Sequence, residues 1–92
     1  MDEAADNRRV YWHSRRGMLE LDLVLMPFAE QVYPGLGEDM QRRYRALLEC
    51  EDADLFAWIV HRGAPDDPEL EIILARVLGD GMPRPELPAG AV

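Results

Sequence analysis

A repeat of apolar residues at helical spacing, early in the chain, constrains the fold more than any other feature. Met18, Leu21, Leu25, Phe28 and Val32 recur at intervals of three and four residues, which places them on one face of a helix. Further apolar residues widen this stripe, namely Leu19, Leu23, Val24 and Met26. The sequence therefore predicts a central helix that neighbours contact on several sides.

Pro27 lies inside this repeat. An interior proline removes a backbone hydrogen bond and clashes with the preceding turn, at a cost of about 3 kcal/mol. We therefore expect either a kink near Met26 or a division into two shorter helices. The dipeptide Pro34-Gly35 then ends the helical pattern.

One helix is expected before this one in the sequence, and another directly after it. The first covers Arg8 to about Arg15, with Asp6 or Asn7 as its cap and residues 1–6 frayed. The other begins at Gly37 and carries acidic residues in its first turn, as the helix dipole prefers. Its predicted inner face comprises Met40, Tyr44, Leu47 and Leu48.

The last two helices have their own start and stop signals. Asp52 is expected to cap one of them, and Gly63 to end it. Its inward residues are predicted to be Leu55, Phe56, Ile59 and Val60. Asp67-Pro68-Glu69 begins the other, since proline is favoured at the first helical position after a capping aspartate. Gly79 closes it after a clean repeat of Leu70, Ile73, Leu74, Val77 and Leu78.

No stretch alternates apolar and polar residues as a half-buried strand would. The expected fold is thus a small all-α bundle of about five helices. Its 92 residues are enough for one domain, which we place at residues 1–79. Residues 80–92, with three prolines, are expected to form a flexible tail.

Charge narrows the class of partner. The formal net charge is -8, which disfavours a nucleic-acid role because the chain repels phosphates. All 10 basic residues are arginine. Arg42, Arg43 and Arg45 form one group, which leaves a helix-turn-helix nucleic-acid binder as an alternative.

No apolar run approaches the roughly 20 residues that span a bilayer. Because the acidic start lacks the basic region of a signal peptide, a cytoplasmic protein without membrane contact is expected.

Residues with catalytic or metal-binding chemistry are few and scattered. His13, His61 and Cys50 lie far apart in sequence, and a zinc site needs about four suitable ligands. Carboxylates beside Cys50 raise the pKa of its thiol and make it less nucleophilic. We therefore expect no metal site and no catalytic residue. An independent enzyme ranks last among the alternatives, and Trp58 is expected to pack in or beside the core.

The stretch Arg15-Arg16-Gly17-Met18-Leu19-Glu20 is not explained by the needs of a helical core. A glycine between two helices gives a core nothing to pack, but it lets another backbone come close. We predict that Gly17 sits in a contact surface, with Arg16 and Glu20 as its polar anchors. Trp12 is of a residue type enriched at binding hot spots, and it is a candidate anchor on the same surface.

Several of these segments, in order, resemble one known family. They are Trp12, the motif Arg16-Gly17-x-x-Glu20, Leu21-Asp22, Met26-Pro27-Phe28 and the run from Leu47 to Trp58. The sequence resembles the succinate dehydrogenase assembly factors, or flavinylation factors, from about Arg8 to Leu78. The resemblance implies a five-helix bundle, in agreement with the pattern of the residues.

The resemblance also implies a function. Such a factor binds the flavoprotein subunit of succinate dehydrogenase, and in some bacteria of fumarate reductase, and promotes covalent attachment of FAD to a histidine of that subunit. By resemblance, Arg16, Gly17 and Glu20 are partner-binding residues, with Arg9 and Trp12 beside them. No cofactor is expected to bind this chain tightly, because FAD is attached to the partner. The main alternative is a generic adaptor or antitoxin-like bundle that uses the same surface.

Overall fold

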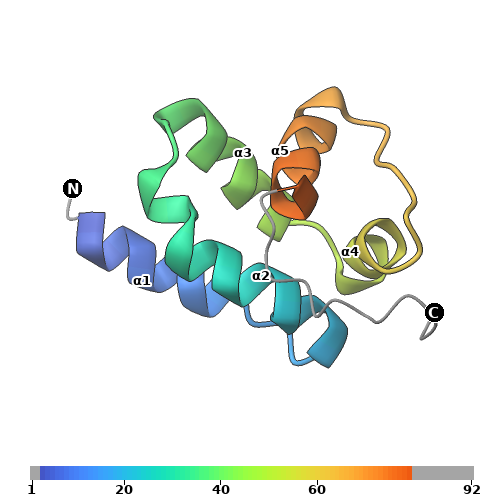
Figure 1. The fold of residues 1–92 in the computed structure, drawn as a ribbon, viewed down its shortest axis with the longest axis horizontal. Helices are drawn as coiled ribbons and strands as arrows, with labels where there is room; N and C mark the ends of the chain where they lie inside the picture. The colour runs from blue at the N-terminus through green and yellow to red at the C-terminus, as the bar shows by residue number, and fades with distance from the viewer. Residues whose placement is uncertain (1–2, 80–92) are drawn as a thin grey trace.

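The computed structural model describes residues 3–79, which form five α-helices and one short 3-10 helix (Figure 1). The helices are α1 (Glu3–His13), α2 (Leu19–Gln31), η1 (Tyr33–Gly35), α3 (Glu38–Leu48), α4 (Asp52–Ile59) and α5 (Pro68–Gly79). Within these residues there is no strand, so the predicted all-α bundle is confirmed. The tail expected at residues 80–92 lies outside the described part of the chain.

Helix α2 occupies the centre of the bundle, as its wide apolar stripe predicts. It packs against α1, η1, α4 and α5, while α3 and α5 pack against each other (Figure 1). In this way α1 and α2 form one side of the molecule, and α3 and α5 form the other. The loop from α1 to α2 lies against the turn from α3 to α4, where Arg16 donates to the Leu48 and Cys50 carbonyls.

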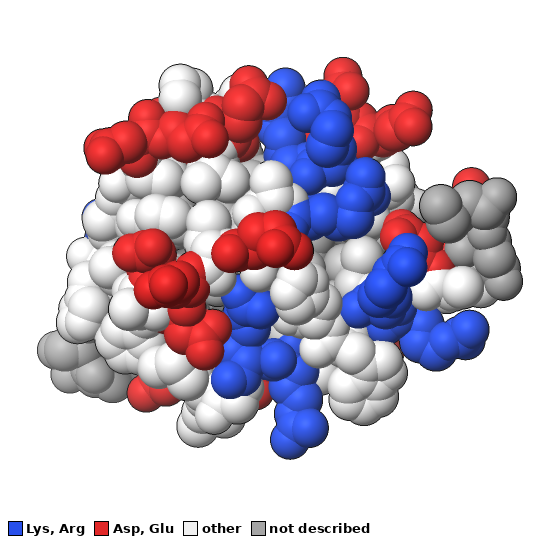
Figure 2. Space-filling view, turned by 180° about the vertical axis from the view of Figure 1, so that it is seen from behind, with Lys and Arg blue, Asp and Glu red and all other residues white. Residues whose placement is uncertain are grey.

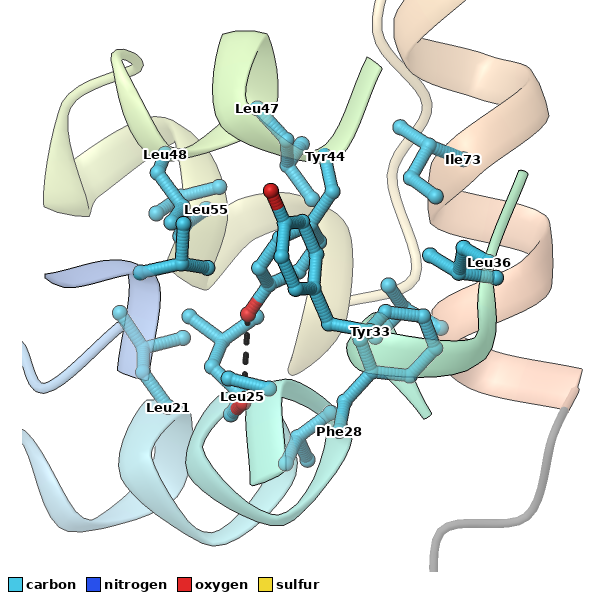
Figure 3. Close-up of a cluster of buried hydrophobic side chains, with 14 residues drawn as sticks. Leu21, Leu25, Phe28, Tyr33, Leu36, Tyr44, Leu47, Leu48, Leu55 and Ile73 are labelled. Atoms are coloured by element: carbon cyan, nitrogen blue, oxygen red, sulfur yellow. Dashed lines mark hydrogen bonds between the residues drawn. The ribbon is translucent and has the colours of Figure 1, made fainter. Parts of the chain in front are cut away.

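The core lies where these helices converge. Side chains of α2, η1 and α3 meet there, with Leu55 from α4 and Ile73 from α5 (Figure 3). Phe28 and Tyr33 both contact the ring of Tyr44, at centroid distances of 5.0 and 5.5 Å. Burying this apolar surface contributes most of the favourable free energy of folding.

A polar junction is buried inside this core. The Tyr44 hydroxyl donates to the Leu25 carbonyl at 3.2 Å, which is the dashed contact in Figure 3. Ser14 Oγ lies 2.8 Å from the same hydroxyl and donates to the Val10 carbonyl at 2.8 Å. These contacts join α1, α2 and α3. Burial raises the pKa of Tyr44, so its hydroxyl stays protonated and able to donate.

The predicted start of the first helix is wrong. Helix α1 begins at Glu3, so Asp6 lies within it and is not a cap. Glu3 and Asp6 fall in its first turn, where the helix dipole stabilises negative charge. The Asp6 carboxylate also accepts from Arg9, at 2.9 Å, and from the Tyr33 hydroxyl, at 2.9 Å. The hydrogen bond from Arg9, followed by that from Tyr33, lowers the pKa of Asp6. These contacts hold a turn that sequence alone assigns to a frayed end.

Of the two alternatives expected at Pro27, a kink or a division, the structure excludes the division into two shorter helices. Helix α2 continues through Pro27 to Gln31. Proline leaves the carbonyl four residues earlier, that of Leu23, without a helical donor. Leu23 is 43% exposed, so this turn of α2 faces solvent, where water can hydrate a free carbonyl. Packing of the buried face of α2 outweighs the remaining cost.

Helix α4 departs from its prediction at both ends. Asp52 is its first residue and not its cap, since the cap position belongs to Glu51. The helix ends at Ile59, and Arg62 rather than Gly63 has a positive φ, of 61°. The Gly63 amide instead returns to the Ala57 carbonyl at 2.9 Å. A side chain there would place its Cβ 3.2 Å from that oxygen, so Gly63 serves close approach.

The inner face of α4 is narrower than predicted, whereas the predictions for Trp58 and Asp67 are confirmed. Leu55 is buried, and Phe56 and Ile59 pack against the core partly buried, so the prediction is confirmed for these three. Val60 is exposed, so the prediction is wrong there. Trp58 packs against the core, as expected. Asp67 Oδ1 accepts from the Glu69 amide at 2.9 Å, so it does cap the start of α5. Gly79 lies in α5 and is the last residue that the structure describes, so its predicted role in closing the helix stays a prediction.

Candidate functional site

The loop that joins α1 to α2 centres on Gly17. This residue has a φ of +82°, a conformation that side chains other than glycine adopt with strain. A Cβ built on Gly17 would meet no atom within 4 Å. Gly17 is therefore needed for the turn itself, and at the same time it leaves a bare stretch of backbone exposed.

The side chain of Arg16 points into the molecule. It is 10% exposed, and its Nη2 donates to the carbonyls of Leu48, at 2.6 Å, and Cys50, at 2.8 Å. Its Nη1 donates to the His13 carbonyl at 3.1 Å. Because α3 ends at Leu48, the guanidinium satisfies carbonyls that have lost their helical donors. Arg16 thereby ties the loop between α1 and α2 to the turn between α3 and α4.

Two aspartates complete the hold on Arg16. Asp22 Oδ1 accepts from the Arg16 backbone amide at 2.7 Å. Asp52 Oδ1 lies 3.1 Å from Arg16 Nε, but the N–H is not aligned for a hydrogen bond and finds no other acceptor. The contact with Asp52 is therefore an ion pair. Sequence reasoning missed both partners, because spacings of 6 and 36 residues match no local pattern.

Glu20 differs from Arg16 in its exposure to solvent and in its lack of side-chain partners. It is exposed in the first turn of α2, and its carboxylate makes no hydrogen bond or ion pair with any described residue. The helix dipole stabilises its negative charge there. Arg16 and Glu20 are thus not paired with each other. Of the two predicted polar anchors, Glu20 is open to solvent while the guanidinium of Arg16 is occupied within the chain.

Arg9 and Trp12, the other predicted contact residues, are both exposed on α1. They lie three residues apart, which places them on one side of the helix. Trp12 is 57% exposed and stands edge-on to Tyr11 at a centroid distance of 5.3 Å. The Arg9 guanidinium donates to Asp6, one turn toward the start of α1. An exposed tryptophan of this size is a candidate anchor for a partner protein.

Two leucines that sequence analysis assigned to the interior are exposed. Leu19 is 69% and Leu23 is 43% exposed, so the predicted width of the buried stripe is wrong at these positions. They are four residues apart, on one side of α2 beside Glu20. The repeat could not reveal this, since it counts apolar residues and not the neighbours that cover them. The two leucines place apolar surface next to the predicted contact residue.

An open groove of about 840 Å³ runs between α1 and α3. Arg9 and His13 line it from α1, and Gln41 and Arg45 line it from α3. Arg45 donates to the Tyr33 hydroxyl at 2.8 Å, and this hydroxyl in turn donates to Asp6.

Within residues 3–79 no group of three or more His, Cys, Asp or Glu side chains is arranged to hold a metal ion. Burial, followed by Asp54, raises the pKa of Cys50.

The arginines of α3 are engaged by acidic side chains of the same chain. Arg42 pairs with Asp39 at 3.2 Å, and Arg43 pairs with Glu69 at 2.7 Å. Figure 2 shows basic side chains in a broken band between acidic ones, with no extended basic patch on this face. Over the described residues, no helix is long and apolar enough to cross a bilayer.

Comparison with known proteins gives a consistent picture. The family model described as "Flavinator of succinate dehydrogenase" matches residues 8–79. The chain is 51% identical over 78 residues to the FAD assembly factor SdhE of Pseudomonas aeruginosa, covering 85% of this chain and 93% of that protein. It is 45% identical over 84 residues to SdhE of Pseudomonas savastanoi pv. phaseolicola, covering 91% and 100%. For SdhE of Yersinia pseudotuberculosis, identity is 47% over 66 residues, covering 71% and 75%.

Proposed function

Since the chain belongs to the family of succinate dehydrogenase flavinators, or FAD assembly factors, we propose that it binds the flavoprotein subunit of succinate dehydrogenase. We propose further that this binding promotes covalent attachment of FAD to a histidine of that subunit. The flavoprotein of fumarate reductase is a second partner of the same kind. The proposal places the chain in the cytoplasm.

The observation that carries this proposal is the exposed surface around the loop from α1 to α2. Gly17 presents bare backbone there, and Glu20 presents a carboxylate without a partner among the described residues. Leu19 and Leu23 add apolar area beside them. A buried apolar centre with a few charge-assisted hydrogen bonds is the usual composition of a specific protein interface. Trp12 and Arg9 extend the surface along α1, and Arg16 adjoins Gly17 in the same loop.

The chain acts as an assembly factor and not as an enzyme in this proposal. The flavoprotein carries both reactants, the flavin and the histidine. A bound partner accelerates the reaction by holding those groups in a productive arrangement, which is a positioning effect. No residue of this chain is assigned a proton transfer, and FAD stays with the flavoprotein. Glu20 is accordingly a contact residue and not a general acid.

Two alternatives predict different partners. A generic adaptor would use the same surface on another protein, and co-purification separates that function from the proposed one. A helix-turn-helix nucleic-acid binder would use Arg42, Arg43 and Arg45. It is not favoured, because acidic side chains engage arginines of this group and the net charge is -8. Salt-dependent DNA binding would be its signature.

The test is covalent flavin fluorescence of the succinate dehydrogenase flavoprotein on a denaturing gel. Cells that lack the gene, and cells that carry Gly17→Arg, are expected to lose the fluorescent band. The bulky side chain blocks the bare backbone at Gly17. Unchanged fluorescence in both strains would contradict the proposal and favour the generic adaptor.

A single carboxylate tests the surface more sharply. Glu20→Gln is expected to weaken binding of the purified flavoprotein about tenfold or more, because loss of a charge-assisted hydrogen bond costs about 1.5–3 kcal/mol. Flavinylation should fall in parallel and recover at high concentrations of the variant. Glu30→Gln, the same change at an exposed position of α2, is the matched control and should behave as wild type. Normal binding by Glu20→Gln with no attachment would show that Glu20 takes part in the chemistry.

A further inference from the structure

We propose that Asp22 is a positioning residue that fixes the loop from α1 to α2 in the form its partner recognises. This inference rests on the proposed function, because it concerns the same surface. Asp22 does not need to touch the partner itself. It acts through Arg16, whose backbone amide it binds, and so determines how Gly17 and Glu20 are presented.

The geometry around Asp22 gives it this role. Its Oδ1 accepts from the Arg16 amide at 2.7 Å, within the range of strong, charge-assisted hydrogen bonds. Asp22 stands on the first turn of α2, as does Glu20. The bond therefore ties the peptide just before Gly17 to the helix that carries Glu20. Gly17 lies between two fixed points of one short closed ring.

The loop needs such a tie because of Gly17. Glycine populates positive and negative φ about equally, so it has more conformational freedom to lose than any other residue. An untethered loop would have to lose that freedom when the partner binds, and the loss lowers affinity. A tether that holds φ at +82° removes this cost in advance. Asp22 thus acts by preorganisation.

The hydrogen bonds of the Arg16 side chain have a different effect from the bond between Asp22 and the Arg16 amide. The guanidinium binds the Leu48 and Cys50 carbonyls and so anchors the loop to the turn between α3 and α4. Asp52 contributes an ion pair to Nε, but its side chain is 47% exposed, so water weakens the attraction. The carbonyl bonds remain without it. We therefore expect loss of Asp22 to have a larger effect on the loop than loss of Asp52.

Two substitutions at Asp22 separate positioning from direct contact. Asparagine keeps the side-chain oxygen that accepts from the Arg16 amide, whereas alanine removes it. Asp22→Ala is expected to bind the purified flavoprotein about tenfold more weakly than wild type, a difference of about 1.4 kcal/mol. Asp22→Asn should stay within about twofold, because the tether survives. Asp54→Ala, at an exposed acid on α4, controls for loss of one negative charge.

A second readout uses the full-length chain without its partner. Hydrogen exchange at the Arg16 amide, followed by NMR, should be at least about tenfold faster in Asp22→Ala than in wild type. Asp22→Asn should protect the amide nearly as well as wild type. Amides of the core helix α3 should exchange as before, which shows that the change is local. Binding is measured well below the unfolding midpoint of each variant, so that unfolding does not mimic lost affinity.

The outcomes are distinct. Wild-type affinity in Asp22→Ala would overturn the proposal, as would unchanged exchange at the Arg16 amide. Equal losses of affinity in Asp22→Asn and Asp22→Ala would also overturn it, since the carboxylate charge would then meet the partner directly. If the wild-type chain fails to bind the flavoprotein, the proposed function fails, while the exchange data on the free chain still decide whether Asp22 holds the loop.

Discussion

At the scale of single residues, the motif Arg16-Gly17-x-x-Glu20 separates into inward and outward parts. The Arg16 guanidinium is occupied by carbonyls of another turn, whereas Glu20 faces solvent. The structure gives one physical reason for glycine at position 17, its φ of +82°, and the open space above it leaves the backbone accessible. A substitution at Gly17 therefore changes the loop conformation and the accessible backbone at once, unless the new residue tolerates positive φ.

Asparagine offers that separation, because it adopts positive φ more readily than other non-glycine residues. Gly17→Ala is expected to lower the free energy of unfolding by about 1 kcal/mol through backbone strain. Gly17→Asn should lower it by less than about half of that amount. Thermal unfolding measures both, at about 4–8 °C per kcal/mol for a domain of this size.

Flavoprotein binding by the same two variants then shows what the partner requires. If close backbone approach matters, Gly17→Asn should bind at least about tenfold more weakly despite its stable fold. Wild-type affinity in Gly17→Asn would mean that glycine serves the turn alone.

At the scale of helices, the bundle depends on one buried polar junction as well as on apolar packing. Tyr44 of α3 reaches the Leu25 carbonyl of α2, and Ser14 follows the last turn of α1. Ser14 is fully buried, so an unsatisfied hydroxyl there would be costly. These hydrogen bonds determine how α1, α2 and α3 pack together. Ser14, which takes part in them, lies two residues before Arg16 in the sequence. The orientation of the binding loop thus depends on the core.

Tyr44→Phe tests this junction, because it keeps the ring and removes the hydroxyl. We expect a loss of about 1–2 kcal/mol in the free energy of unfolding, since buried polar groups lose a partner. The unfolding midpoint should fall by about 5–15 °C. The control is Tyr11→Phe, whose hydroxyl bonds no described residue, and it should change the midpoint little. Equal midpoints for Tyr44→Phe and wild type would show that apolar packing alone orients the helices.

At the scale of the whole molecule, the buried core of the described chain runs from Val10 to Val77. The family model ends at residue 79, which is also the last residue that the structure describes. Because every helix of the described chain contributes side chains to this core, we expect these residues to supply the stability of the bundle. On the face shown in Figure 2, acidic side chains are interleaved with arginines, so the net charge does not create one dominant patch there.

A chain that ends at Gly79 is expected to fold and bind like the full-length chain. Its unfolding midpoint should stay within about 3 °C, the shift that about 0.5 kcal/mol produces in a small domain. Its affinity for the flavoprotein should change by less than about threefold. Differential scanning calorimetry and a binding titration measure the two quantities. A large drop in the midpoint would place part of the stabilising contacts beyond residue 79.

The sequence by itself determined the all-α class, the central position of α2, the start of α5 at Asp67-Pro68 and the resemblance to the flavinylation factors. These features are local or periodic: helical spacing, caps and short motifs are written within a few residues of each other. Helix starts that depend on distant partners were misplaced for the same reason. Tyr33, 27 residues away in the chain, donates to Asp6 and so stabilises the first turn of α1.

Only the tertiary structure decided which face of each helix is covered and where each charged side chain is directed. Leu19 and Leu23 fit the apolar repeat, yet no neighbouring helix packs over them enough to bury them. Arg16 turns inward because the end of α3 brings free carbonyls to it across 32 residues of chain. Burial and long-range hydrogen bonds depend on which segments contact each other in the folded chain. The spacing of apolar residues within one helix does not determine those contacts.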